Sequence, residues 1–270
     1  MTARLRPAGA LVLIDDAADA AVRLGPAIGL LWLTALPSRL LLSLVCARLV
    51  ELGPKATSYG DSFTRLAYAT LGAWLLSLWG RQVFVRSCRR ALESEQPPPS
   101  PLLRIPLPEF AGYVFSALVI ETLFWALLLT LVAPLALLAA AGLAAAASPR
   151  ERAGLVNPFR AIGESMGSLS VLLRLAALFA LALALAALNL HLLFAAGLWL
   201  AAGLAAIDGA AWSAVLSPFN PLYGILLVAG ATLLIEPFWL AALTGHVERA
   251  RSRKSGDDLR QWFAAIKART

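Results

Sequence analysis

The stretch LLIEPFWLAALTGHVERARSRKSGDDL, residues 233–259, decides how this chain is interpreted. It places Glu236 and Pro237 inside an apolar run and then turns basic. A carboxyl group at the centre of a bilayer is costly and usually faces other helices, whereas Arg and Lys beside an apolar run mark the cytoplasmic end of a membrane span. We therefore predict a membrane-spanning helix that ends in the cytoplasm.

The composition of the whole chain agrees with that interpretation. Hydrophobic residues make up 60% of the 270 residues, charged residues only 14%, and the mean hydropathy is +0.75. Soluble domains contain roughly 45–50% apolar residues, so this is an integral membrane protein. The net charge of +7 comes mainly from Arg at the borders of apolar stretches. Such flanks explain the charge better than nucleic-acid binding, so we expect no nucleic-acid partner.

The apolar segments predict an all-α, polytopic helix bundle of about six transmembrane helices, because a span needs about 20 mostly apolar residues. Pro134 divides the long apolar stretch 110–148, which predicts a tight turn and a short return helix there. The predicted spans cover residues 25–48, 63–85, 110–131, 133–149, 172–200 and 222–245.

The basic residues orient this bundle. Of the 23 Lys and Arg residues, 19 fall in segments that are cytoplasmic if the N-terminus is inside. The predicted outer segments hold Arg48, Lys55 and Arg65, and Arg39 lies within a span. This bias predicts that both termini are cytoplasmic. Arg4 and Arg6 imitate a signal peptide, but acidic residues soon interrupt the apolar run, so we expect the N-terminus to be retained.

We predict a single integral membrane domain, residues 1–270. It begins with an interfacial helix, 1–24, followed by four spans, 25–148, with a stiff Pro-rich cytoplasmic linker at 93–109. A second interfacial helix, capped by Asn157 with Pro158 in its first turn, and the last two spans occupy 149–245. The basic amphipathic tail is 246–270. Similar segments at 35–44 and 187–196, and at 72–81 and 230–239, leave open a duplication into two related halves.

A few polar side chains are predicted at membrane depth or close to it. They have two interpretations: interhelical hydrogen bonds and ion pairs that hold the bundle together, or a pathway for ions or a small solute. Pro237 also frees a backbone carbonyl one turn before it. The candidate residues are Arg39, Arg81, Glu121, Asn189, His191 and Glu236.

A second set of candidates is basic and aromatic and is expected at the cytoplasmic surface, where it would meet anionic lipids or a partner protein. The set comprises Arg86, Arg89, Arg90, Arg249, Arg251, Arg253, Lys254, Trp262 and Phe263. We find no catalytic constellation, and Cys46 and Cys88 with two histidines offer no metal-site spacing. We therefore expect no enzyme activity, no metal and no cofactor.

The residues Arg251-Ser-Arg253-Lys254-Ser-Gly256-Asp257-Asp258-Leu259 match an Arg-x-Arg-x-x-Gly-x-Asp-Leu pattern after the last span. On this motif, and on the Asn157–Leu169 segment, the chain resembles a group of bacterial six-helix membrane proteins. The group is similar to the membrane domain attached to some glycerophosphodiester phosphodiesterases. Leu243-Thr-Gly-His-Val247 replaces the group's Tyr-rich approach to the motif.

The resemblance implies a bacterial inner-membrane location and no catalytic residues, because the hydrolase chemistry of such proteins belongs to a separate domain. Stand-alone members are often encoded beside MoxR-type ATPases, which implies a protein partner of that system. We expect a non-enzymatic scaffold or subunit of an envelope-associated complex. The alternative is a transporter or channel that uses Arg39, Glu121, His191 and Glu236 in one water-accessible cavity.

Overall fold

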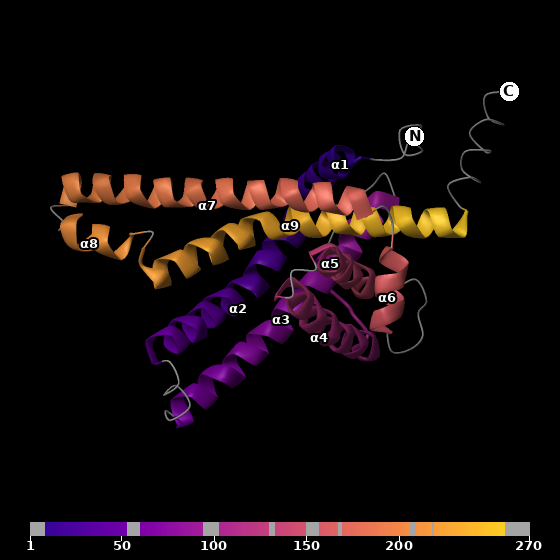
Figure 1. The fold of residues 1–270 in the computed structure, drawn as a ribbon, viewed down its shortest axis with the longest axis horizontal. Helices are drawn as coiled ribbons and strands as arrows, with labels where there is room; N and C mark the ends of the chain where they lie inside the picture. Colours follow the sequence, from indigo (N-terminus) through magenta and orange to yellow (C-terminus); the bar gives the residue numbers. More distant parts are fainter. Residues whose placement is uncertain are drawn as a thin grey trace. The chain divides into compact units, whose positions relative to one another are not determined.

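The computed structural model describes residues 9–52, 60–93, 103–129, 133–149, 157–166, 169–205, 209–217 and 219–256. Within these ranges the regular structure is α-helical, as Figure 1 shows, so the predicted all-α class is confirmed. Most of the Pro-rich linker and the whole tail after Gly256, including Trp262 and Phe263, lie outside the described residues.

Figure 1 shows the helices in chain order. Their bounds are α1 Ala10–Arg23, α2 Gly25–Leu52, α3 Gly60–Glu93, α4 Leu107–Leu129, α5 Ala133–Ala147, α6 Pro158–Ser165, α7 Leu169–Ala205, α8 Gly209–Val215 and α9 Pro221–Ser255. The segments predicted to span the membrane correspond to α2, α3, α4, α5, α7 and α9.

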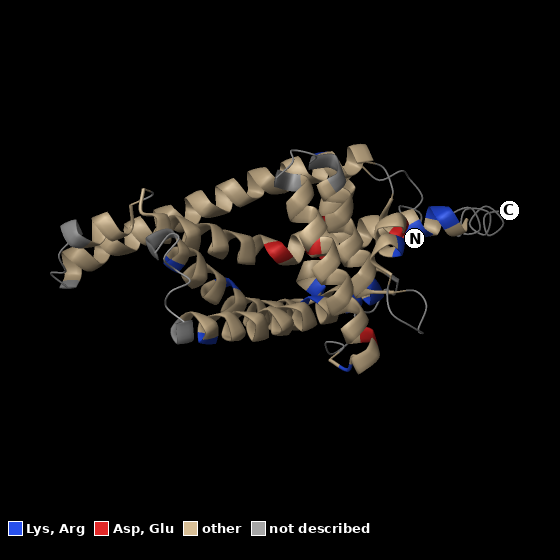
Figure 2. Cartoon of the chain, turned by 60° about the horizontal axis from the view of Figure 1, so that its bottom comes forward, with Lys and Arg blue, Asp and Glu red and all other residues tan. Residues whose placement is uncertain are grey.

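Four helices in the described part of the chain are long and apolar enough to cross a membrane, within Gly25–Leu49, Leu107–Leu127, Leu169–Leu204 and Pro221–Ser255. They support a membrane-embedded protein. The six predicted spans also include α3 and α5. At 15 residues, α5 is about 22 Å long, which is shorter than the roughly 30 Å hydrocarbon core of a bilayer. In Figure 2 most of the ribbon is tan, because charged residues occupy only short stretches of helix.

The chain forms two compact units. The first consists of residues 1–31, 78–178 and 237–270, and the second of residues 32–77 and 179–236. Each unit therefore joins segments from both halves of the sequence, so the units do not correspond to the two related halves that the sequence suggested. On α9, the division falls between Glu236 and Pro237.

Local sequence explains several helix ends. The Asn157 side chain accepts hydrogen bonds from the backbone N–H groups of Phe159 and Arg160, at 2.9 and 3.3 Å, which confirms the predicted cap of α6. At the end of α9, Gly256 has a φ of +70°, a conformation that glycine adopts without the steric cost that other residues meet.

The start of α4 corrects one boundary. The Pro-rich linker was predicted to continue through residue 109, but α4 begins at Leu107 and includes Pro108. Proline is tolerated in the first helical turn because the N–H that it lacks has no partner within the helix there. The helix therefore starts within the predicted linker.

Helices α4 and α5 form a hairpin that contacts the C-terminal end of α3 within the first unit. Arg86 binds Glu109 at the start of α4, at 2.8 Å, and Arg89 donates to Ser148 just after α5, at 3.2 Å. Arg86 and Arg89 are about one turn apart on α3. The start of α4 and the end of α5 therefore lie close together, as expected if a tight turn near Pro134 joins the two helices. Residues 130–132 lie outside the described ranges.

Small residues let α6 approach this hairpin closely. Ala141, Ala144, Ala145, Ala146 and Ala147 of α5 are at most 2% exposed. A Cβ atom on Gly142 would lie 2.7 Å from Cγ1 of Ile162 in α6, closer than carbon atoms pack. The alanine-rich sequence of α5 therefore builds a contact surface for α6, which brings the acidic residue Glu164 next to the basic end of α9.

Candidate functional site

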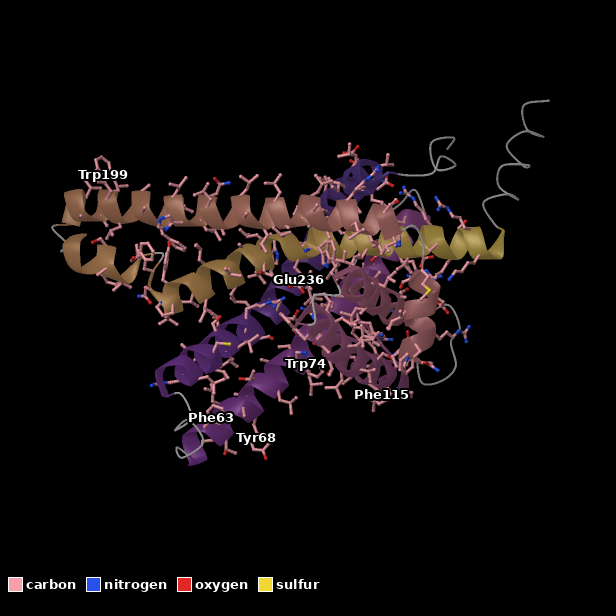
Figure 3. All side chains as sticks on the ribbon, in the orientation of Figure 1. Phe63, Tyr68, Trp74, Phe115, Trp199 and Glu236 are labelled. Carbon is pink, nitrogen blue, oxygen red and sulfur yellow. The ribbon has the colours of Figure 1, made fainter. Side chains whose placement is uncertain are left out.

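The intramembrane charges of the second unit form an ion pair between α2 and α9. A guanidinium nitrogen of Arg39 lies 3.2 Å from a carboxylate oxygen of Glu236. Glu236, labelled in Figure 3, is only 6% exposed, and Arg39 is 25% exposed. A charge at membrane depth is tolerated when it faces a partner of opposite sign. The pair therefore explains how both residues fit within apolar helices.

A second ion pair lies within the first unit, between α3 and α4. Nη1 of Arg81 is 3.0 Å from a carboxylate oxygen of Glu121. Both side chains are partly buried. The predicted pairing of an intramembrane arginine with a glutamate is thus found twice, and each pair joins two different helices.

Within the second unit, His191 of α7 shares a 2.9 Å hydrogen bond with the Tyr223 hydroxyl of α9. The two rings also lie against each other, with centroids 5.8 Å apart. Asn189, two residues earlier on α7, is exposed. The structure thus joins His191 to α9 and leaves Asn189 on a different side of the same helix.

The proline of α9 is compensated by a tryptophan. Pro237 has no N–H, so the Leu233 carbonyl, four residues earlier, has no partner within the helix. The indole Nε1 of Trp32 in α2 donates a hydrogen bond to that carbonyl at 2.9 Å. Trp32 and Arg39 are about two turns apart on α2, so this helix contacts both the Leu233 carbonyl and Glu236 of α9. Sequence analysis predicted the freed carbonyl but not its donor.

These partners bear on the transport alternative. That alternative required Arg39, Glu121, His191 and Glu236 to line one water-accessible cavity. Within the second unit, Arg39 pairs with Glu236 and His191 binds Tyr223, and within the first unit Glu121 pairs with Arg81. Each of these contacts joins two helices, and each charge has a neighbour of opposite sign. The arrangement suits interhelical stabilisation, and a shared pathway stays a prediction.

Arg251, in the Arg-x-Arg-x-x-Gly-x-Asp-Leu motif, is buried near the end of α9 at 3% exposure. Nε and Nη2 donate to a carboxylate oxygen of Glu164, at 3.0 and 2.7 Å. Nη1 donates to the Ser148 carbonyl and to Glu248, and Nη2 also donates to the Ala145 carbonyl. The five N–H groups of the guanidinium are thus all accounted for.

The Arg251 contacts join three helices of the first unit. The Ala145 carbonyl belongs to the last turn of α5 and the Ser148 carbonyl follows directly after it. At such a helix end, carbonyls lack helical partners and carry partial negative charge. Glu164 comes from α6, and Arg251 and Glu248 come from α9. The prediction of Arg251 as a surface residue for lipid or a partner is therefore corrected: its donors are used inside the protein.

Other predicted basic residues are also engaged within the first unit. Arg86 binds Glu109, Arg89 lies 3.7 Å from a carboxylate oxygen of Glu248, and Arg249 pairs with Asp16 of α1. Sequence analysis missed the acidic partners, because they are far away in the chain. Lysine and arginine residues flanking a span are ordinarily interpreted through the membrane charge bias, which carries no information about such contacts.

A smaller group of residues remains exposed near the junction of α6 and α9. Arg160 is 58% exposed and pairs with Glu164, Arg253 is exposed, and exposed Lys254 donates to the Gly163 carbonyl. Phe159 and Met166 are 71% and 54% exposed. We call Phe159, Arg160, Met166, Arg253 and Lys254 the α6–α9 surface. Arg90, on α3, is exposed as well.

Comparisons with known proteins add no assignment. No protein-family model matches the chain, and neither a search of curated proteins nor one of solved structures found a match. Within the described ranges, no group of three or more His, Cys, Asp or Glu side chains could hold a metal ion. The candidate site is therefore defined by its own geometry: interhelical ion pairs, the Arg251 cluster and the α6–α9 surface.

Proposed function

We propose that this chain is a non-enzymatic membrane scaffold, a subunit of a cell-envelope complex in the bacterial inner membrane. In this proposal six helices cross the membrane, including α3 and the short α5, and both termini are cytoplasmic. The positive charge bias of the sequence supports this orientation. The resemblance to six-helix membrane proteins supports the bacterial location and a partner from a MoxR-type ATPase system.

The observation that carries the proposal is the use made of the buried charges. Arg251 uses its donors on α5, α6 and α9 within the first unit, and the Arg39–Glu236 pair joins α2 to α9 within the second. Charges that are paired between helices hold those helices in a rigid frame. A transport site, in contrast, must bind a ligand and release it. A rigid frame is what a scaffold subunit requires.

The α6–α9 surface is the proposed contact with the surroundings. It combines the aromatic ring of Phe159 and the thioether of Met166 with the cations of Arg253 and Lys254. Apolar groups beside basic ones suit an anionic membrane surface, where each Lys or Arg contributes about 1 kcal/mol. In this proposal the surface lies at the inner leaflet and forms part of the place where a cytoplasmic partner binds.

The testing experiment is purification of the tagged protein from its native membrane in mild detergent, followed by mass spectrometry of co-purifying proteins and lipids. The expected result is a stoichiometric envelope protein that is lost from the Arg253→Glu, Lys254→Glu variant. The Arg23→Glu variant is the matched control, because Arg23 is an exposed cation at the end of α1. A lone protein that retains one tightly bound small molecule would contradict the proposal and favour transport.

A further inference from the structure

The exposed amide of Asn189 has no role in the scaffold proposed above. Asn189 lies 15 residues after Arg174 on α7, about 22 Å along the helix, among apolar residues. It is exposed, and its side chain makes no hydrogen bond to another residue in the described ranges. An amide at membrane depth is costly when no partner satisfies it. Another transmembrane helix can supply such a partner.

Asn189 lies on the side of α7 that faces away from α9. His191 and Phe194 contact Tyr223 of α9, and a Cβ atom on Gly230 of α9 would lie 3.4 Å from Leu190. Asn189 precedes His191 by two residues, which is about 200° around a helix. Its amide therefore points away from α9.

The residues around Asn189 form a regular apolar seam. Its positions are separated alternately by three and four residues, which is the heptad spacing of paired helices. Along the seam, Leu185, Leu192 and Trp199 are 51%, 55% and 79% exposed. Figure 3 shows Trp199 on the side of α7 turned away from α8. The seam consists of Ala182, Leu185, Asn189, Leu192, Ala196, Trp199 and Gly203.

Within this seam, every seventh residue is small or is Asn189. Ala182, Ala196 and Gly203 are the small ones. Small residues let the backbones of two membrane helices approach closely, and one asparagine at such a position sets the register of a helix pair. The seam therefore combines close packing with one polar group that can fix the alignment.

We propose that this seam is an interface with a second copy of the same chain, in which the two α7 helices run parallel and the two Asn189 side chains bind each other. All copies insert with one orientation, so a two-fold axis along the membrane normal brings each seam residue opposite itself at the same depth. An amide carries both donor and acceptor groups, so two asparagines satisfy one another. That self-complementarity selects a second copy as the occupant.

The test measures self-association of the full chain in lipid bilayers by single-molecule photobleaching over a range of protein densities. We expect a monomer–dimer equilibrium in the wild-type chain and a roughly tenfold weaker dimer for Asn189→Leu. The matched control exchanges two adjacent residues, Leu188→Asn with Asn189→Leu. It keeps the composition but moves the amide about 100° around the helix, so the dimer stays weak.

Disulfide cross-linking gives a second readout that does not depend on the energy of the amide contact. In a chain with Cys46→Ala and Cys88→Ala, Ala196→Cys is expected to cross-link to itself, whereas Ala195→Cys, on the flank of the seam, is not. Monomers at every density, equal cross-linking at both positions, or cross-linking of Ala196→Cys in native membranes to a different protein alone would each overturn the proposal.

Discussion

The indole Nε1 of Trp32 donates a hydrogen bond of 2.9 Å to the carbonyl of Leu233. That carbonyl is the backbone group that Pro237 deprives of its partner within α9. A break in a membrane helix is thus repaired by a side chain that is 201 residues away in the sequence. Because the donor belongs to α2, the repair also joins α2 to α9.

Replacing this donor is expected to destabilise the protein through the exposed carbonyl. Trp32→Phe keeps most of the apolar ring but removes the N–H, and we expect a loss of about 1–2 kcal/mol in the free energy of unfolding. Pro237→Ala restores an N–H to the helix, so Trp32→Phe should cost less in that background. Unfolding of the four variants in detergent measures the difference, and an equal loss in both backgrounds would contradict the role assigned to Trp32.

Arg251 and Arg253 belong to the same motif but are expected to behave differently. Arg251→Met removes the donor that Arg251 provides to Glu164 and to the carbonyls at the end of α5. We expect the free energy of unfolding to fall by about 2–4 kcal/mol. Glu164 and Glu248 keep some access to solvent, which limits this loss. Arg253→Met alters an exposed side chain and should change stability by about 0.5 kcal/mol or less. Thermal unfolding of both variants is the measurement. Equal losses would mean that Arg251 is not held as described.

Cys88 provides a pH-dependent prediction. It lies beyond the predicted span 63–85, and burial raises the pKa of its thiol to about 12, while a hydrogen bond with Thr244 acts in the opposite direction. At pH 8 Cys88 in the folded protein is then almost entirely the protonated thiol. Alkylation at pH 8 should therefore label Cys46 before Cys88, and Cys88 should react only on unfolding. Equal rates in the folded protein would contradict this burial.

The same pKa shift predicts the direction of a stability change. Above about pH 8.5 an unfolded thiol releases its proton, whereas the folded Cys88 keeps it up to about pH 12. The folded state then binds more protons than the unfolded state, so stability should fall as the pH rises through this window. Cys88→Ala removes this contribution. Unfolding of both proteins at pH 8 and pH 10 should show a smaller decrease for the variant.

The topology of the α4–α5 hairpin tests the proposed six-span arrangement. If both helices cross the membrane, residues 130–132 lie outside, although α5 is only 15 residues long. A phosphatase reporter inserted after residue 131 should then be active, and one inserted after residue 152 should be inactive. Inactive reporters at both positions would mean that α4 and α5 enter the membrane without crossing it.

The sequence predicted the features that depend on composition and on residues close together in the chain. The helical class followed from composition, and the cap at Asn157 followed from a short motif next to Pro158. The partners of Trp32 and Arg251 could not be predicted, because they depend on residues brought together only by packing. The basic residues at the end of α9 predicted exposed charges. Arg251 is nevertheless buried, because small alanines of α5 leave the helix-end carbonyls within reach.

The apolar part of α7 is longer than the hydrocarbon core of a bilayer is thick. Leu175–Ala205 contains no Asp, Glu, Lys or Arg and is about 46 Å long, whereas the bilayer's hydrocarbon core measures about 30 Å. Tilting alone would need roughly 50°, beyond the usual range of about 0–40° for membrane helices. Hydrophobic mismatch should therefore thicken the bilayer around α7, and the protein should partition into membranes with longer acyl chains.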